Sequence, residues 1–249
     1  MADLWAQLLQ GLEAILRFFH SLAEPLFGAA SWGWAVILLT VAVRLALLPL
    51  AVKQINSMRA MQRLQPELKK IQTKYKVDRS LLRSNPEKYR ERRQKQQEAM
   101  MQLYKEHNVN PAGGCLPLIL QAPVFFALFS LLRGDAVPEL SSNGFYLTSS
   151  LAGFPREVGP GGWLLIALMG LTTFWAQKQM MANNPTSAQQ PQQKMLLYFM
   201  PVMLAFFAIN LPVGVLLYWV TTNAWTMGQQ WLMFRNIEAA PAAAKPAKP

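Results

Sequence analysis

The chain has 249 residues, of which 52% are apolar, and a formal net charge of +11. Its single cysteine excludes an internal disulfide, and its two histidines lie far apart, so we expect no metal site and no cofactor. Charge is unevenly distributed, because 15 of the 24 Lys and Arg residues fall within residues 53–107. Stretches of about 20 residues with almost no charge predict transmembrane helices. The expected class is an all-α membrane protein with one large basic segment.

Residues 1–31 are predicted to form an N-terminal extracytoplasmic segment containing an amphipathic helix. Between Leu4 and Phe19 the apolar side chains recur every three or four residues, with Glu13 and Arg17 among them. This pattern favours a helix that lies in the membrane interface. The alternative is a helix that is buried against the transmembrane spans.

Five transmembrane helices are predicted from the apolar stretches, at residues 32–52, 111–133, 162–178, 195–209 and 215–234. An extracytoplasmic loop at 134–161, a cytoplasmic loop at 179–194 and a tight extracytoplasmic turn at 210–214 connect the last four. The apolar parts of the third and fourth spans have about 15 residues, which reach only about 22 Å as a helix. Such short spans predict a locally thinned bilayer.

Residues 53–110 are predicted to form a basic cytoplasmic hairpin of two helices. Asn85 and Pro86 provide a helix start after the first amphipathic segment. Membrane topology alone explains a basic cytoplasmic loop. The alternative is a docking surface for ribosomal RNA, anionic lipid or a partner protein. The patterns of RNA-binding domains are absent, so we expect no sequence-specific nucleic acid binding.

The basic segments predict the orientation of the chain. With five spans, residues 53–110, residues 179–194 and the tail at 235–249 all lie on one side, and the positive-inside rule makes that side the cytoplasm. The N-terminus is then outside and the C-terminus is cytoplasmic. The tail is rich in Ala, Pro and Lys, and we expect it to be disordered.

Arg44 is the most informative residue, because it is a charge within the apolar stretch of the first span. A charged side chain at the centre of a bilayer costs about 2.5–3.5 kcal/mol on insertion scales. No span contains Asp or Glu, so water or polar side chains must surround Arg44, and Thr40 lies one turn away. Polar residues on other spans could complete a hydrated groove; the alternative is simple hydrogen bonding between helices. The candidate site residues are Arg44, Gln121, Thr173, Gln177, Tyr218, Trp219 and Thr222.

Three segments resemble the YidC/Oxa/Alb family of membrane protein insertases. Residues 41–50 resemble the family's first core span, residues 103–128 the entry to its second, and residues 212–223 its fifth. The resemblance extends over about residues 30–235. It implies a five-helix core around a polar groove that is open to the cytosol and to lipid, with a mobile cytoplasmic hairpin. It also implies that Arg44 is the groove arginine and that Gln177 and Trp219 line the groove.

The sequence therefore predicts a non-enzymatic insertase and chaperone for small integral membrane proteins in the bacterial plasma (inner) membrane. Its expected partners are nascent membrane proteins and membrane lipids, with the ribosome and the Sec translocon as candidates. One alternative is a small-anion transporter or channel that uses Arg44 as its binding charge. Another is an assembly scaffold that acts through the basic hairpin.

Overall fold

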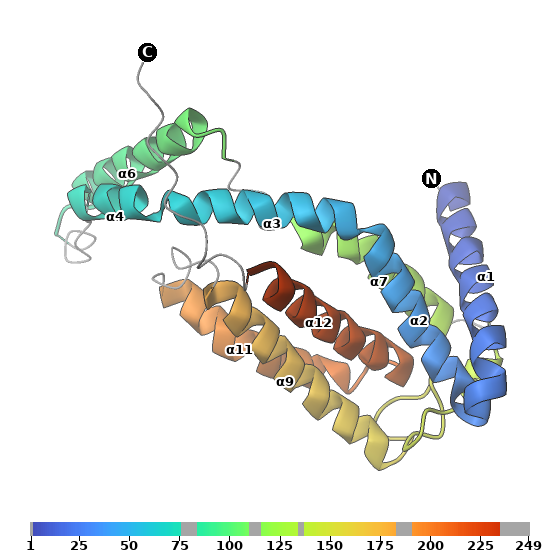
Figure 1. Cartoon of the computed structure of the whole chain (residues 1–249). Coiled ribbons are helices and arrows are strands. Elements are labelled where there is room, and N and C mark those ends of the chain that lie inside the picture. The colour runs from blue at the N-terminus through green and yellow to red at the C-terminus, as the bar shows by residue number, and fades with distance from the viewer. Residues whose placement is uncertain (1, 76–83, 110–115, 134–136, 183–190, 235–249) are drawn as a thin grey trace. The chain divides into compact units, whose positions relative to one another are not determined.

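The computed structural model describes residues 2–75, 84–109, 116–133, 137–182 and 191–234 (Figure 1). These residues are mostly helical, and their β pairing is limited to an isolated bridge between Phe145 and Thr148. The predicted all-α class is therefore confirmed. The predicted tail at 235–249 and the start of the second span lie outside the described residues.

The chain divides into two compact units. Unit 1 comprises residues 1–47, 122–180 and 195–249, and unit 2 comprises residues 48–121 and 181–194. The helices that lie wholly or mainly in unit 1 are α1 (Ala2–Phe27), η1 (Gly28–Ala30), α2 (Ser31–Ala46), α7 (Leu116–Arg133), α8 (Glu139–Ser142), α9 (Pro160–Ala182), α11 (Pro191–Ala208) and α12 (Val213–Phe234). Unit 2 contains α3 (Leu48–Arg63), α4 (Gln65–Lys74) and α6 (Pro86–Glu106).

Prolines mark where several helices begin. Pro49 and Pro66 lie in the first two positions of α3 and α4, and α6, α9 and α11 each open with a proline. Proline suits the first turn, because the amide hydrogen that it lacks has no partner there. Pro49 cannot donate a hydrogen bond back to the preceding turn. The helix of the predicted first span consequently ends at Ala46 and does not continue to Val52.

In unit 1, α1 packs along α2 (Figure 1). The α1 side chains that are buried include Leu12 and Leu16, whereas Leu4 and Phe18 are 72% and 57% exposed. The helix therefore has features of both alternatives suggested by its sequence. One stripe is buried in the protein, and a second apolar stripe remains on the surface.

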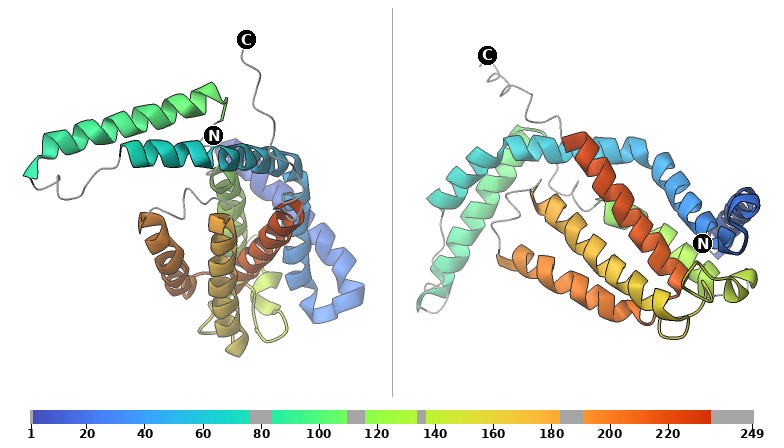
Figure 2. Two further views of the ribbon diagram at one scale, coloured as in Figure 1. Left: turned by 60° about the vertical axis from the view of Figure 1, so that its left-hand side comes forward. Right: turned by 60° about the horizontal axis from the view of Figure 1, so that its bottom comes forward.

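Helix α9 lies between α11 and α12 in both views of Figure 2. Gly170 of α9 approaches Ala205 of α11, and the rings of Phe174 and Tyr198 lie 6.0 Å apart. The two helices have 23 and 18 residues and are therefore longer than the 15-residue apolar segments. Each helix continues from its apolar segment into polar sequence, so the apolar length is still about 15 residues and the thinned bilayer stays a prediction. Their outer surfaces carry exposed apolar side chains, among them Leu171, Trp175, Val202 and Phe206.

The described part of the loop before α9 is folded and makes backbone contacts with two helices. Its buried side chains include Leu140 and Leu151. The Leu151 carbonyl accepts a hydrogen bond from the Gly214 amide at 2.8 Å, and the Leu147 carbonyl accepts one from the Gly161 amide at 3.1 Å. These bonds satisfy amide groups at the starts of α12 and α9, which have no partner within their own helices. The loop thus holds the N-terminal ends of both helices.

Gly162 provides a test of this attachment. A Cβ atom at Gly162 would collide with the backbone of Pro155, and backbone cannot move aside as a flexible side chain can. Gly162→Ala is expected to destabilise unit 1 by about 1–3 kcal/mol, as overpacking usually does. The measurement is thermal unfolding in detergent. Gly228→Ala is the matched control, because a Cβ there meets nothing within 4 Å, and its unfolding temperature should not fall.

In unit 2, α4 packs against α6. Leu64, Leu68 and Leu103 form a small buried core. Glu67, near the start of α4, lies 3.6 Å from His107 at the end of α6, so the two helices run in opposite directions. The Asn85 side chain accepts a hydrogen bond from the Lys88 amide at 3.0 Å, which confirms the predicted start of the second helix.

One helical stretch among the described residues, residues 3–46, is long and apolar enough to cross a membrane by length and composition. Two shorter apolar helices cover residues 121–133 and 197–208. Helices α9 and α12 are long enough, but polar side chains such as Lys178 and Asn223 lower their mean hydropathy. The count of five spans therefore stays a prediction.

Candidate functional site

Arg44 lies in the last turn of α2 and is partly buried. Its Nε atom is buried and has no hydrogen-bond partner among the described residues. Thr40, the expected neighbour, donates its hydroxyl hydrogen to the Val36 carbonyl at 2.7 Å. The Thr40 donor is therefore satisfied within its own helix. The negative end of the helix dipole favours a cation in this turn by about 0.3–1 kcal/mol, less than the expected cost of burial.

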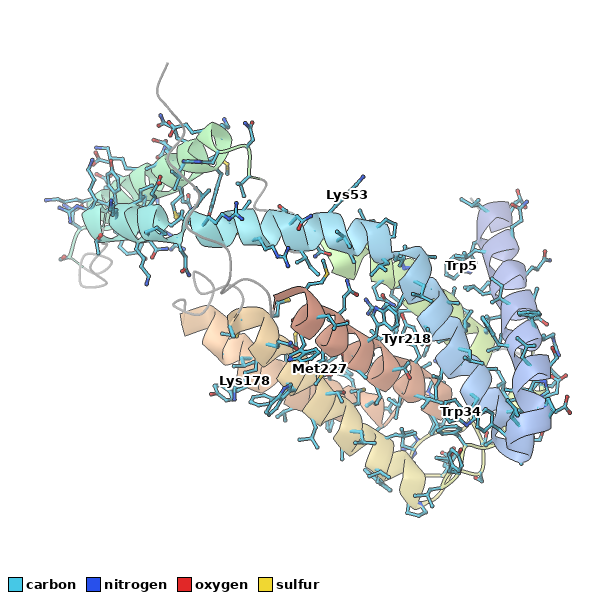
Figure 3. The ribbon with its side chains drawn as sticks, in the orientation of Figure 1. Trp5, Trp34, Lys53, Lys178, Tyr218 and Met227 are labelled. Carbon is cyan, nitrogen blue, oxygen red and sulfur yellow. The ribbon has the colours of Figure 1, made fainter. Side chains whose placement is uncertain are left out.

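Tyr218 and Thr222 lie one turn apart on α12, which packs against α2. Figure 3 shows Tyr218 between these two helices. The Tyr218 side chain is 3% exposed, and the buried hydroxyls of Tyr218 and Thr222 lie close to each other, with no hydrogen-bond partner on any other described residue. The Tyr218 hydroxyl is close enough to Arg44 to interact with it electrostatically. Buried polar groups without partners are rare in proteins, so water or a bound polar group is expected here.

Aromatic side chains lie next to these polar groups. The Phe125 ring on α7 lies 6.5 Å from the Tyr218 ring and 5.6 Å from the Trp219 ring, measured between centroids. Trp219 is partly buried. The candidate site thus combines one cation and two hydroxyls with neighbouring aromatic rings. This combination suits a bound molecule that has a polar part and an apolar part.

Thr173 lies at a contact between α9 and α12. It is 5% exposed, and its hydroxyl accepts a hydrogen bond from Asn223 Nδ2 at 2.9 Å. The hydroxyl of Thr172 accepts a second bond from the same nitrogen at 3.1 Å. Thr173 therefore takes part in hydrogen bonding between helices, and its place in a groove stays a prediction. Gln177 is partly buried, and Gln121 belongs to unit 2, so both stay predictions as site residues.

Three polar residues of these helices were not predicted from the sequence. Asn223 bridges α12 to α9, and Gln179 Nε2 donates to the Met227 carbonyl at 3.3 Å. Gln230 is 9% exposed, and its side-chain oxygen is buried without a partner in the described ranges. An amide within an apolar helix is itself a usable signal, since a buried amide needs partners. It does not indicate which helix supplies them.

Arg17 links α1 to α8. Its Nε donates to Glu13 and its Nη1 to Glu139, each at 2.9 Å. The hydrogen bond from Arg17 lowers the pKa of Glu139 below its ordinary value of 4.5. All three side chains are partly solvent-exposed, so this network contributes modestly to stability.

The lowered pKa predicts a dependence on acid. A carboxyl group with a depressed pKa contributes stability above its unfolded pKa, and this contribution disappears as the pH falls through the folded value. Between pH 7 and pH values below 4.5, the wild type should therefore lose more thermal stability than Glu139→Gln. Unfolding temperatures of the two proteins in detergent, compared at neutral and at acidic pH, check this. Equal losses would show that the Arg17 contact has no energetic role.

The sequence model of the family described as "60Kd inner membrane protein" matches residues 22–86 and 83–240. The "Membrane protein insertase YidC" of Streptomyces avermitilis is 41% identical over 250 residues, covering 88% of this chain. The chain belongs to the YidC/Oxa family. A YidC from Maridesulfovibrio salexigens is 35% identical over 89% of the chain, and one from Anaeromyxobacter sp. (strain K) is 36% identical over 98%.

A solved structure also resembles the chain. It is described as "Active YidC insertase crystal structure with the first transmembrane domain resolved", with a TM-score of 0.62 and 29% identity over 90% of this chain. The alignment covers 46% of that structure, 55% of the Streptomyces YidC and 39% of the Maridesulfovibrio YidC. The chain thus spans about half the length of its YidC relatives or less. The family resemblance predicted from the motifs is confirmed.

Proposed function

We propose that this chain is a membrane protein insertase and chaperone of the bacterial inner membrane, and that it acts without covalent chemistry. Its membership of the YidC/Oxa family and the names of its relatives support this function over an anion transporter. The observation that carries the mechanism is the buried Arg44 Nε, which has no partner in the described chain and lies on a helix that packs beside Tyr218 and Thr222.

The proposed core has five spans with the N-terminus outside and the C-terminus in the cytoplasm. Arg44, Tyr218, Trp219 and Thr222 would line a groove that opens to the cytosol, with Thr173 and Gln177 as further predicted residues. Two apolar surfaces on α9 and α11 would face lipid, where side chains such as Leu171 and Phe206 gain most from contact with hydrocarbon.

In this mechanism, the hydrophilic and often acidic end of a substrate enters the groove from the cytosol. Arg44 attracts its carboxylates, and the hydroxyls of Tyr218 and Thr222 offer hydrogen bonds to its backbone. The following apolar helix of the substrate then moves into lipid beside α9 and α12. Transfer of that helix from water supplies the driving force, at about 25 cal/mol for each Å² of apolar surface.

Unit 2 would lie in the cytoplasm and offer its basic helices to partners. The exposed Lys69, Lys70, Arg92 and Arg93 provide charge for anionic surfaces. Nascent chains, lipids, the ribosome and the Sec translocon are the proposed partners. The charge distribution and the family membership support the proposed orientation and partners.

Reconstitution tests the function directly. Purified protein in liposomes is expected to insert a small single-span or double-span membrane protein that is synthesised in a cell-free system, and protein-free liposomes should not. Protease protection of the translocated segment measures insertion. A similar protected fraction with and without the protein would refute the insertase proposal, and flux of a small anion through the same liposomes would favour the transporter.

A further inference from the structure

Helices α9 and α12 are held together by different means at their two ends. At their N-terminal ends, the backbone of the preceding loop binds Gly161 and Gly214. A Cβ atom at Gly161 would lie 2.6 Å from the Leu147 carbonyl, so the start of α9 packs closely against the backbone of the loop. Backbone contacts of this kind are difficult to exchange, and the N-terminal ends should therefore stay together.

Further along, side chains provide the polar links between the two helices. Asn223 Nδ2 donates to the hydroxyls of Thr172 and Thr173, and Gln179 donates to the Met227 carbonyl. We call these contacts the polar seam. Hydrogen bonds between membrane helices contribute on average about 0.6 kcal/mol each, and another polar group can replace either partner. The seam is consequently the part of this pair that can open.

Asn223 has the central position in the seam. One nitrogen joins two neighbouring hydroxyls, and Thr173 is 5% exposed. Thr172 also bonds within its own helix, since its hydroxyl donates to the Leu168 carbonyl at 2.7 Å. Its hydroxyl hydrogen is therefore satisfied without Asn223, and its oxygen accepts from Asn223 without disturbing α9. Losing the amide would remove two of the three hydrogen bonds of the polar seam while each helix keeps its own hydrogen bonds.

We propose that Asn223 is a positioning residue that latches α12 to α9, so that the pair opens at its C-terminal ends while the loop holds its N-terminal ends. The role in insertion rests on the proposed function, because a substrate helix would enter lipid beside these two helices. Opening would widen that path, and polar groups of a passing substrate could replace the bonds of the latch.

Distances between nitroxide spin labels test the latch in the full chain. Cys115→Ser provides a background without the native cysteine. Labels at Met180→Cys and Leu232→Cys report on the C-terminal ends of the pair, and both native side chains are exposed. Labels at Leu164→Cys and Asn210→Cys, which are also exposed and lie near the starts of α9 and α12, report on the loop side. Pulsed electron paramagnetic resonance in liposomes without any substrate gives each distance distribution.

Asn223→Ala is expected to add a longer distance for the C-terminal labels and to leave the loop-side labels unchanged. The open population should rise by about threefold for each bond lost, given the average strength of such bonds. Thr172→Val with Thr173→Val should give the same shift, and Thr172→Ser with Thr173→Ser should not. Thr221→Val is the matched control on α12, because its hydroxyl donates to the Leu217 carbonyl of its own helix.

Two results would overturn the latch. One is an unchanged C-terminal distance in both Asn223→Ala and the double valine variant. The other is a broadening at both label pairs, which would indicate general loosening. Because no substrate is present, these results are independent of whether the chain inserts proteins. Liposomes that fail to insert any substrate would refute the proposed function while leaving the measured opening intact.

Discussion

Arg44→Ala should reduce insertion of substrates with an acidic translocated segment at least tenfold. Two unit charges about 4 Å apart attract by about 4 kcal/mol at an effective dielectric constant of about 20. An Asp at the bilayer centre costs about 2.5–3.5 kcal/mol, so the attraction is large enough to offset one carboxylate. Each loss of about 1.4 kcal/mol of transition-state stabilisation lowers the rate by about tenfold. The rate of protease protection in reconstituted liposomes measures the effect.

Matched variants separate charge from structure. Arg44→Lys should retain much of the rate, since it keeps the charge but not the planar guanidinium. Arg133→Ala removes an exposed arginine at the end of α7 and should have little effect. Substrates whose translocated Asp residues are changed to Asn should insert almost equally with the wild type and with the Arg44→Ala variant. An equal loss for acidic and neutral substrates would contradict an electrostatic role for Arg44.

Helix starts and turns were predicted correctly, because they depend on residues that are adjacent in the sequence. Asn85 followed by Pro86 indicated the start of α6, and Asn210 to Gly214 indicated the turn between α11 and α12, which the structure confirms. The ends of the predicted spans were taken from hydropathy, and they agree less well with the ends of the helices. The first span was expected to reach Val52, although Pro49 favours a helix start. Helix α9 was expected to end near Lys178, although a charge does not interrupt backbone hydrogen bonds.

The contacts of the site depend on which helices are neighbours. Sequence patterns placed Thr173 and Thr222 on polar stripes, but the partner of Thr173 is 50 residues away. Residue spacing contains no information on that pairing, so Asn223 was not selected. Thr40 illustrates the opposite case, because it is near Arg44 in sequence but bonds Val36. Arg44 itself was found from sequence, since a charge in an apolar stretch needs an explanation in any packing.

Leu132→Ala is the second change with a large expected effect, this time on stability. The Leu132 side chain is 1% exposed, and a Cβ at Gly214 would lie 2.9 Å from its Cδ2 atom. It therefore fills the space where α7 meets the start of α12. Truncating a buried Leu costs about 2–5 kcal/mol in proteins, with about 24 cal/mol for each Å³ of cavity that remains. Unfolding of the purified protein in mixed detergent micelles is expected to show a loss in this range.

Leu171→Ala on α9 is the matched control, because the same atoms are removed from a side chain that is 66% exposed. Lipid tails are as apolar as leucine, so an exposed side chain on a spanning helix gains little from packing, and lipid fills the space it leaves. The control should therefore lose much less stability than Leu132→Ala. If both variants lost the same stability, the loss would depend on the apolar volume removed and not on its position. Packing of α7 on α12 would then not be what stabilises unit 1. A larger loss for Leu132→Ala would instead show that the contact between α7 and the start of α12 stabilises unit 1.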